Sequence, residues 1–382
     1  MNILFITQWY PNRQHPFFGI FVREHARAIQ SAGHTVQVLA LSLHKSKSIF
    51  KKKLYHYTDE NGIKTIQCEL HSYFKDLLYH LPQVQFFFLN QAYRREVSSF
   101  KADIIHSHTI YPAGIWGHDL AKRLETPHII TEHWSRLTNF ASSFYFAKAR
   151  EAYQSAAALL PVSNYLKNNI QSVVPGLSDD KFSIIGNVVD ESLFRYQPNE
   201  NPSHEITFCA VATWQHKKNP DKMPELFIDA LSELQKNAPQ TFKLVIIGGG
   251  NKLPDLQTRC EKANLKTRFT GFLPKEKIAE ELHKADYFVH ASHIETFSIV
   301  VAEALACGVP VICSSAGALV ELINRKNGVL TNNTKAEWVT AIEHALSTTY
   351  NRQAIAEELN ERFSPEAIGL KIASVYQKTK EG

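Results

Sequence analysis

Short apolar runs alternate with amphipathic stretches along the whole chain. The runs lie at 2–8, 34–41, 102–108, 127–132, 159–163 and 182–185 in the first half, and at 206–212, 242–247, 268–270, 287–290 and 309–314 in the second. The stretch after the first run has helical spacing instead, with Phe21, Ala28 and Ile29 on one face. Buried strands that alternate with helices predict parallel sheets covered by helices, which is an α/β fold.

The two series of strands are separated by a polar, proline-bearing segment at 197–204. Such composition is typical of a linker, and a length of 382 residues suits two to three domains. The sequence therefore predicts one domain over 1–196 and a second of similar architecture after it, with a cleft between them. Helices are expected to fill the chain beyond Leu330, and the last of them is expected over 365–380.

Composition narrows the class of protein. The net charge is +5 and the pI is about 8.8, which fits anionic substrates or anionic lipid but is too weak to indicate nucleic acid. The five cysteines form no C-x-x-C pair, and we expect reduced core thiols of a cytoplasmic protein. The amino-terminal residues are expected to form a strand rather than a signal peptide, and no apolar stretch approaches the roughly 18 residues of a membrane span.

Glu295 and Glu303 stand eight residues apart between the runs 287–290 and 309–314. This order predicts strand, loop, helix and strand, with the helix beginning near 297–298. Its free N–H groups and its dipole would face the carboxyl end of the sheet, where a phosphate is favoured. At about 1.5 Å rise per residue the two carboxylates bracket roughly 12 Å, the reach of a sugar, a pyrophosphate and a ribose. The alternative is a pair of solvated glutamates, although the apolar neighbours of Glu303 disfavour it.

Two runs of the first half end in histidine, at His108 and at His133. Because the carboxyl ends of parallel strands share one edge, both imidazoles are expected on the ligand side of the sheet. Gly19 stands where the first loop meets the first helix. No G-x-G-x-x-G accompanies it, so the dinucleotide-binding fingerprint is absent.

The run E-x7-E followed by A-L-A-C-G-V-P-V, from Glu295 to Val311, resembles the signature of retaining glycosyltransferases of GT-B architecture, specifically glycosyltransferase family 4. The resemblance extends over nearly the whole chain. It implies two Rossmann-like, doubly wound parallel-sheet domains that face each other across a cleft. The acceptor domain would be 1–196, the nucleotide-sugar donor domain 197–363, and the helix of 364–382 would cross back to the first domain.

The same resemblance implies a role for each matching residue. Glu295 would contact the sugar hydroxyls, and Glu303 the ribose hydroxyls. His133 would stabilise charge near the transferred sugar, and Lys218 would bind the donor pyrophosphate, so the catalytic set is Glu295, His133 and Lys218. The donor-binding set is Gly19, Thr213, Lys218, Phe272, Leu273, Glu295, Phe297, Ser298, Ile299 and Glu303. On the acceptor side we place His108 and Arg136.

The chain departs from the family pattern at two places. Thr213 replaces the arginine of G-R-x4-K-G, which removes one charge from the leaving-group site unless His216 or Lys217 substitutes for it. Thr296 and Ser298 stand where glycine is frequent, but Ser298 keeps its N–H and adds a hydroxyl that suits a helix N-cap.

The resemblance implies sugar transfer from a nucleotide-diphospho-sugar, UDP- or GDP-linked, to a hydroxyl of a saccharide or lipid-linked acceptor, with retention and in cell-surface polysaccharide or glycolipid synthesis. No D-x-D occurs in the chain, so we expect no metal–diphosphate clamp and no cofactor. A hydrolase-like acid and nucleophile pair is not expected, because such carboxylates lie about 5–5.5 Å apart. Two alternatives stay open: a phosphorylase or sugar-nucleotide epimerase of the same architecture, or a non-catalytic protein that binds sugar nucleotides or polysaccharide.

Lysines are interleaved with aromatic and aliphatic residues over 45–57, and further aromatic residues follow at 73–79 and 86–89. The lysines are Lys45, Lys47, Lys51, Lys52 and Lys53. One interpretation is a solvated loop and a core helix. The other is a basic, aromatic face that rests on anionic membrane near a lipid-linked acceptor, at the inner face of the cell membrane.

Overall fold

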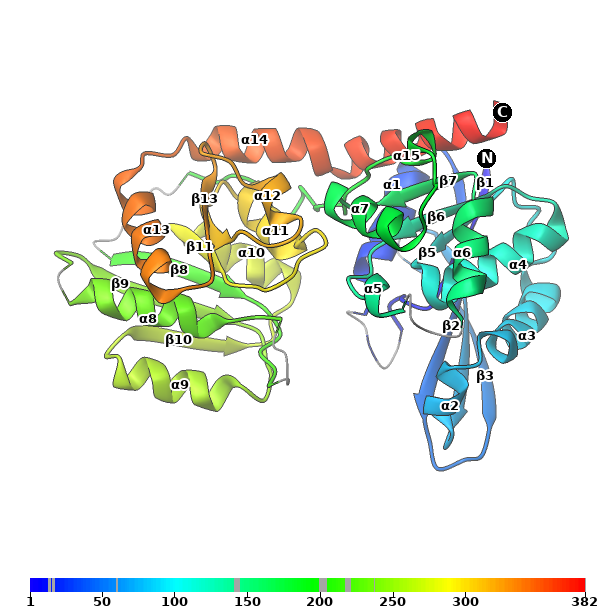
Figure 1. Cartoon of the computed structure of the whole chain (residues 1–382), viewed down its shortest axis with the longest axis horizontal. Helices are drawn as coiled ribbons and strands as arrows, with labels where there is room; N and C mark the ends of the chain where they lie inside the picture. The colour runs from blue at the N-terminus through cyan, green and yellow to red at the C-terminus, as the bar shows by residue number, and fades with distance from the viewer. Residues whose placement is uncertain are drawn as a thin grey trace. The chain divides into compact units, whose positions relative to one another are not determined.

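The computed structural model describes residues 1–12, 15, 18–59, 61–140 (only the backbone at 138–139), 145–198, 205–216, 221–236 and 238–381. It divides into two compact units, shown in Figure 1. Unit 1 comprises Met1–Val188 and Pro365–Gly382, and unit 2 comprises Val189–Ser364. The structural division thus falls before the boundary expected after residue 196, and most of the expected linker, 199–204, lies outside the described residues.

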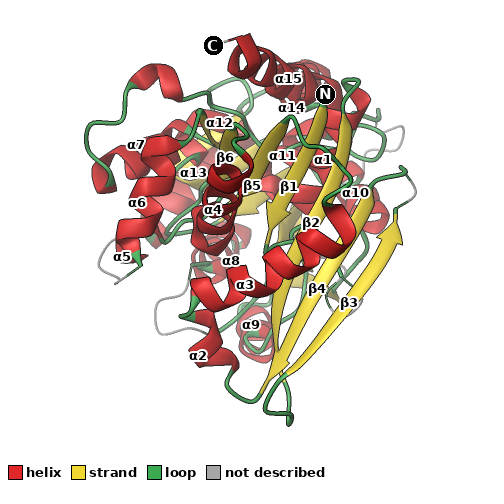
Figure 2. Cartoon of the chain, turned by 90° about the vertical axis from the view of Figure 1, so that its right-hand side faces the viewer, coloured by secondary structure: helices red, strands yellow, loops and turns green. Residues whose placement is uncertain are grey.

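Unit 1 is built on a seven-stranded sheet of order β3-β4-β2-β1-β5-β6-β7. The strands are β1 (Asn2–Thr7), β2 (Thr35–Lys45), β3 (Lys51–Thr58), β4 (Lys64–Ser72), β5 (Ile104–His108), β6 (His128–Glu132) and β7 (Ala158–Pro161). All neighbouring pairs are parallel except β3 and β4. Figure 2 shows β2, β4 and β3 as the long strands at one side of this sheet.

Helices cover the unit 1 sheet. They are α1 (Ile20–Ser31), α2 (Lys75–Tyr79), α3 (Pro82–Ala92), α4 (Ile115–Leu124), α5 (Leu137–Phe140), α6 (Phe146–Ser155), α7 (Asn164–Val173) and α15 (Pro365–Glu381), with short helical turns at Tyr93–Val97, Ile110–Gly114 and Asp179–Lys181. The chain returns to this unit with α15, which packs closely on α1. Glycine at position 369 allows this approach, since a Cβ there would lie only 2.3 Å from the carbonyl oxygen of Ala28. The Tyr376 hydroxyl of α15 bonds Nδ1 of His106 at 2.6 Å.

Unit 2 is built on a six-stranded parallel sheet of order β10-β9-β8-β11-β12-β13. Its strands are β8 (Glu205–Val211), β9 (Thr241–Ile247), β10 (Lys266–Gly271), β11 (Tyr287–His290), β12 (Val311–Ser314) and β13 (Gly328–Thr331). Its helices are α8 (Pro224–Gln235), α9 (Leu253–Lys262), α10 (Lys275–His283), α11 (Ile299–Ala306), α12 (Leu319–Leu322), α13 (Lys335–Ser347) and α14 (Arg352–Phe363). Its core joins the inner faces of β8 and β9 to α8 and α13, with Trp338 fully buried.

The two helix-covered, mainly parallel sheets confirm the predicted α/β fold class. The elements α1 and β11 have the predicted bounds. Three details were wrong. The run 182–185 is no strand, since Phe182 makes only an isolated bridge to Leu159. The lysine-rich segment is not a loop, because Lys51–Thr58 forms β3, the antiparallel edge of the sheet. The strand β4 (Lys64–Ser72) was missed, because polar residues alternate with its apolar ones. The helix after Glu295 begins at Ile299 with Ser298 as its N-cap, within one residue of the expected start.

The five cysteines are buried free thiols, as predicted for core positions. Among the described residues, no helix combines the length and the apolar character that crossing a membrane requires.

Candidate active site

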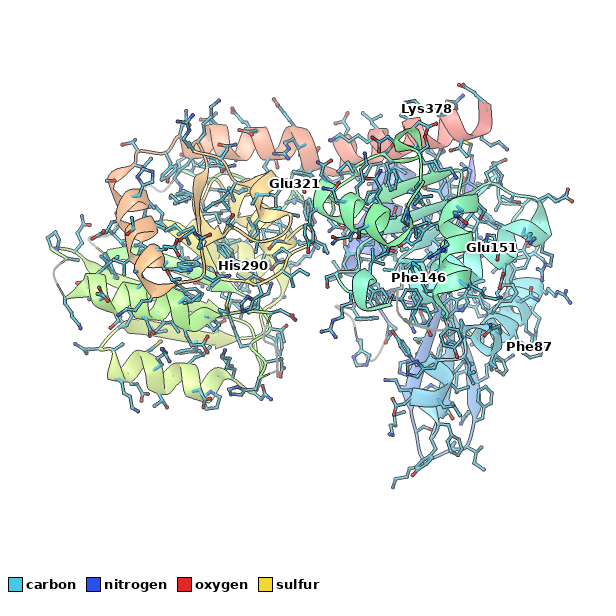
Figure 3. The ribbon with its side chains drawn as sticks, viewed as in Figure 1. Phe87, Phe146, Glu151, His290, Glu321 and Lys378 are labelled. Carbon is cyan, nitrogen blue, oxygen red and sulfur yellow. The ribbon has the colours of Figure 1, made fainter. Side chains whose placement is uncertain are left out.

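Glu295 lies in a largely buried polar network of unit 2, at the carboxyl end of β11, where its side chain is 12% exposed and that of Lys222 is 26% exposed. Its Oε1 accepts a hydrogen bond from Nε2 of His290 at 2.6 Å and forms an ion pair with Lys222. The Lys222 ammonium lies 3.3 Å from Nε2 of His290 and 3.4 Å from Oγ of Ser292. His290 ends β11 inside the unit, as Figure 3 shows. The network thus gathers an acid, a cation and an imidazole at the strand end that precedes α11.

Charge in this network is set by burial and by the neighbours. Burial alone would raise the pKa of Glu295, but the hydrogen bond from His290 and the charge of Lys222 outweigh it and lower that pKa to about 2. Burial, and then the charge of Lys222, lower the pKa of His290. At neutral pH Glu295 is therefore a carboxylate, and His290 is a neutral imidazole that donates from Nε2.

The loop before α11 holds Ser298 in the left-handed region, with φ of 72°. Glycine is the residue that adopts this conformation without strain, which gives a physical reason for the glycine frequent here in the family. The predicted capping role of the Ser298 hydroxyl is wrong: it makes no cap bond, and its Oγ lies instead 3.5 Å from Nε2 of His290.

The other predicted donor residues around α11 differ in exposure. Phe297 is 3% exposed and packs edge to face on Phe363 at 5.0 Å, so only its backbone is free to meet a ligand. Ile299 is half-buried at the first turn, and Glu303 is 5% exposed on the inner side of the helix. The burial of Glu303 rules out the solvated interpretation of this residue.

Two loops meet at the carboxyl ends of β8 and β9. The N–H of Trp214 donates to the carbonyl oxygen of Gly249 at 2.9 Å, and a Cβ at Gly250 would lie 1.8 Å from the carbonyl oxygen of Trp214. Glycines are therefore required for the two backbones to approach. Thr213 lies exposed on the first loop.

Phe272 is exposed and its ring lies over Gly249, while Leu273 is half-buried. His216 lies on the described part of the loop after β8. Lys218 and its neighbour Lys217, the expected pyrophosphate ligands, lie outside the described residues.

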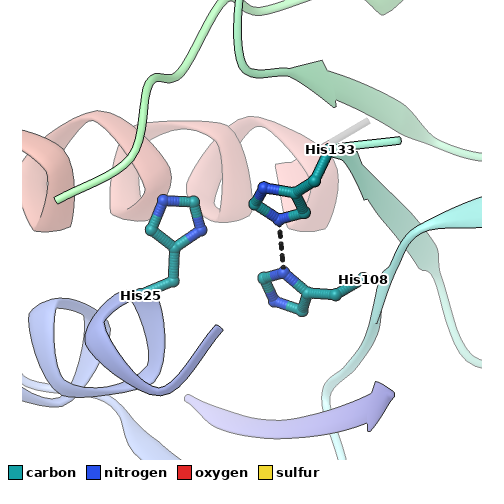
Figure 4. A group of neighbouring side chains, drawn as sticks. All are labelled: His25, His108 and His133. Atoms are coloured by element: carbon teal, nitrogen blue, oxygen red, sulfur yellow. Dashed lines mark hydrogen bonds between the residues drawn. The ribbon is translucent and has the colours of Figure 1, made fainter. Parts of the chain in front are cut away.

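Three histidines come together in unit 1, as Figure 4 shows: His25 of α1, His108 of β5 and His133 after β6. Nδ1 of His108 and Nε2 of His133 lie 3.1 Å apart and share a hydrogen bond. Nε2 of His25 donates to the carbonyl oxygen of Gly186 at 3.0 Å, so its Nδ1 carries the lone pair and faces the other two rings. The predicted convergence of His108 and His133 is therefore present, and His25 joins them.

All three imidazoles are neutral at pH 7. Burial, weakly opposed by the bond to Gly186, lowers the pKa of His25 to about 4. Burial and the neighbouring histidines lower the pKa of His108 and of His133 well below the ordinary range. One ring nitrogen from each lies within 4.8 Å of the others, and neutral imidazoles are ligands for divalent transition metals. Such an ion would have to replace the proton shared by His108 and His133.

Glu132 fixes the backbone around the group of His25, His108 and His133 through four hydrogen bonds. One carboxylate oxygen accepts from the backbone N–H groups of His133 and Trp134 at 2.9 Å, and the other accepts from Ile110 N–H at 2.8 Å and the Tyr153 hydroxyl at 2.7 Å. Burial raises the pKa of Glu132, and these four bonds oppose the rise. The carboxylate thereby ties the loop after β5 to the loop after β6.

Arg136 is exposed after β6, and Gly19 caps α1. Gly19 has φ of 71°, and a Cβ there would lie 2.2 Å from the carbonyl carbon of Trp9. Local sterics are thus a sufficient reason for glycine at this position, whatever its contact with a donor.

Sequence reasoning missed Lys222, His290, His25 and Glu132. His290 and Glu132 carried the same signal that drew attention to His108, a polar residue at the carboxyl end of a buried strand. Lys222 and His25 gave no such signal, because only the packing of α1 and of the segment before α8 brings them to these sites.

Known proteins resemble this chain over most of its length. Residues 19–193 match the family described as Glycosyltransferase Family 4, and residues 195–367 match that described as Glycosyl transferases group 1. The chain is 27% identical to an uncharacterized glycosyltransferase of Methanocaldococcus jannaschii, over 82% of this chain and 88% of that protein. It is 26% identical to the glycosyltransferase TuaC of Bacillus subtilis, named for teichuronic acid biosynthesis, over 90% of each chain.

Among solved structures, HepE of Anabaena in complex with UDP superposes with a TM-score of 0.70 at 18% identity, over 99% of this chain and 100% of that one. At this identity the likeness establishes the fold alone.

Proposed function

The chain belongs to glycosyltransferase family 4 and has the GT-B fold, and we propose that it transfers a sugar from a nucleotide-diphospho-sugar to an acceptor hydroxyl with retention of configuration. The proposal assigns the donor to unit 2 and the acceptor to unit 1. We take the donor to be UDP- or GDP-linked, and the relation to a protein named for teichuronic acid biosynthesis supports a role in cell-surface polysaccharide or glycolipid synthesis.

The network of Glu295, Lys222 and His290 at the start of α11 is the observation that carries the proposal. A helix amino terminus offers unpaired N–H groups and a partial positive charge, which suit a diphosphate. Beside it stands a carboxylate that stays ionised, since its pKa is about 2. An ionised carboxylate accepts hydrogen bonds from sugar hydroxyls, as the resemblance implies for Glu295.

We further propose that Lys222 supplies the cation lost with arginine at Thr213. Its ammonium lies in the same network as Glu295 and within 3.5 Å of two other side chains, so it is positioned before the donor arrives. A positioned cation stabilises the charge that develops on the diphosphate leaving group. Together with Lys218 and the α11 amides, it removes the need for a metal clamp in the proposed reaction.

His133 contacts the transferred sugar in this proposal, and its neutral ring limits how it acts. A neutral imidazole stabilises charge through its N–H dipole and not as a cation. Glu132 holds the backbone of His133 and the hydrogen bond with His108 holds its ring, so the imidazole is oriented before substrate binds.

The test is release of nucleoside diphosphate in the presence of acceptor, after a thermal-shift screen with UDP-, GDP- and ADP-sugars. We expect one nucleotide to raise the melting temperature, and we expect Glu295→Ala to abolish transfer while circular dichroism shows an intact fold. Full activity of Glu295→Ala would refute the assigned role, and nucleotide binding without turnover in the wild type would favour a non-catalytic binding protein. Unchanged turnover in EDTA is expected for the metal-independent reaction.

We also propose peripheral contact with anionic membrane through an exposed apolar group in unit 1, here called the aromatic face. It consists of Ile49, Phe50, Tyr73, Phe74, Leu77 and Phe87, which are 40% to 78% exposed. Figure 3 places Phe87 on the outer side of α3. Lys51, Lys52 and Lys53 lie on the adjoining edge strand β3, so apolar contact and attraction to anionic headgroups would act together.

A further inference from the structure

A pocket of about 870 Å³ opens in unit 1 at the carboxyl ends of β1 and β2, beside α2. One part of its wall is aromatic, with Trp9, Phe18 and Tyr79. Another part is polar, with Asn12, Ser42 and His44. The pocket shares no lining residue with the group of His25, His108 and His133, so it is a second polar site of the same unit.

The polar wall rests on a buried hydrogen-bond network. Nε2 of His44 lies 2.7 Å from Oγ of Ser42, and Ser42 accepts from the Gln67 amide at 2.9 Å. His71 stacks on His44 at 4.9 Å and donates to Glu69 at 2.8 Å. Glu69 is only 3% exposed and its carboxylate lies against His71 at 2.8 Å and His44 at 4.0 Å, so it is not offered to the pocket. A wall fixed in this way presents hydroxyl and imidazole groups in a defined geometry.

The described lining carries cations and no acid. Lys45 and Lys75 both line the pocket, whereas Glu69 lies behind its wall. The carboxylate of Asp76 lies 3.6 Å from the Lys45 ammonium, but both groups are largely exposed, so the pair is weak. Burial lowers the pKa of His44, the charge of Glu69 opposes that lowering, and His71, His15 and Lys75 add to it. An anion in the pocket would meet two lysines with no competing carboxylate on the described wall.

The same short helix joins the pocket to the aromatic face. Lys75 and Tyr79 of α2 line the pocket, while Leu77 of α2 and the preceding Phe74 are more than half exposed. A ligand with a polar, anionic head and an apolar chain would place the head among the lysines and the chain along the aromatic face. Aromatic rings such as Trp9 and Tyr79 suit the apolar face of a sugar ring.

We propose that this pocket binds the acceptor as a glycosyl phosphate or diphosphate. The phosphoryl group lies between Lys45 and Lys75, and the sugar lies against the aromatic wall with its hydroxyls bonded to Ser42 and His44. The inference rests on the proposed glycosyl transfer and specifies its acceptor. Lipid-linked and free glycosyl phosphates share this chemistry, and the test separates them.

The test is isothermal titration of the full chain with farnesyl diphosphate, glucose 1-phosphate and methyl glucoside. The nucleoside diphosphate that most raises the melting temperature is kept at saturation, so that the donor site of unit 2 is filled. We expect glucose 1-phosphate to bind at least about tenfold more tightly than methyl glucoside, because only the former meets the lysines. Tighter binding of farnesyl diphosphate than of glucose 1-phosphate would assign a lipid-linked acceptor, and the reverse order would assign a free one.

The double variant Lys45→Gln with Lys75→Gln should bind both phosphate probes at least about tenfold more weakly. Lys47→Gln removes the same charge two positions along the chain from Lys45, at a residue that does not line the pocket, and should leave both affinities unchanged. The proposal is overturned if the double variant binds the phosphate probes as the wild type does, or if no phosphate probe binds. The nucleotide thermal shift is read on the same variants, so loss of the pocket is distinguished from failure of the donor site.

Discussion

Nε2 of His290 lies 2.6 Å from Oε1 of Glu295, and this bond joins the last residue of β11 to the loop before α11. The contact keeps the carboxylate of Glu295 in place at the amino end of α11, and it accounts in part for the lowering of its pKa to about 2. Lys222 completes the group. An acid that is largely buried and also ionised needs such partners, since burial alone would favour the neutral form.

Lys222→Met should lower turnover by about 100-fold, because one positioned charge is removed from the leaving-group site. The variant keeps the length of the side chain, and nucleotide-dependent initial rates measure the effect. We also expect a lower melting temperature, since Glu295 would lose the charge that compensates it. Lys252→Met, which breaks the ion pair with Glu225 elsewhere in unit 2, is the matched control and should keep its rate. A wild-type rate in Lys222→Met would contradict the role of this lysine.

Acid should destabilise unit 1 through its buried histidines. The pKa of His25 falls from 6.5 in the unfolded chain to about 4 when folded, so the unfolded state binds more protons between these values. Above pH 6.5, His25 is neutral in both states and costs no stability. As the pH falls from 6.5 toward about 4, the free energy of unfolding decreases by about 3 kcal/mol. His108 and His133 face it, and their lowered pKa values act in the same direction.

Urea unfolding of the wild type and of His25→Gln, compared at neutral and at mildly acidic pH, measures this contribution. Glutamine keeps a donor for the carbonyl oxygen of Gly186 but does not titrate. The variant should therefore lose less stability on acidification than the wild type does. Equal losses in both proteins would show that His25 is not the group responsible.

Ser298→Gly should raise the free energy of unfolding by about 1 kcal/mol, because glycine adopts the positive φ of 72° without steric cost. Ser298→Ala is the control. It removes the hydroxyl but keeps the Cβ, and so it should bring no gain. Thermal and urea unfolding of the three proteins measure the difference. If both variants are destabilised alike, the contact of the hydroxyl with His290 matters more than the strain in the backbone.

Lys51, Lys52 and Lys53 changed together to Glu should abolish most sedimentation with anionic liposomes, and binding of the wild type should weaken with salt. The control is a triple variant with the same change of charge in unit 2, in which three exposed lysines are replaced by Glu: Lys236, Lys262 and Lys284. The control should still sediment. Persistent binding of the β3 variant would refute electrostatic contact through this edge of the sheet.

Local pattern was sufficient for most of the strands that lie in the middle of each sheet. The exception is β4, which is buried but was missed because polar residues alternate with apolar ones along it. Strands such as β11 are buried on both faces and read as continuous apolar runs, so their bounds follow from the sequence. The edge strand β3 is half exposed and rich in lysine, and its own sequence does not indicate that it pairs with β4. The run 182–185 shows the opposite error, because an apolar segment that pairs with only one residue of β7 forms no strand.

The candidate site divides in the same way. The sequence placed Glu295 before a helix and Glu303 within it, since motif and periodicity lie close together along the chain. It also placed His108 and His133 at one edge, because parallel strands share a direction. It gave no sign of Lys222 beside Glu295, 73 positions away, or of His25 facing His133.

What the sequence alone determined is most of the buried strands and the helices between them, the class of fold, and the chemistry that motif residues bring to strand ends. These depend on burial periodicity and on neighbours within a few positions. Only the tertiary structure decided which charged and polar groups from distant segments meet, and which of them stay ionised. Those outcomes depend on side-chain packing and on exclusion of water, which no local pattern records.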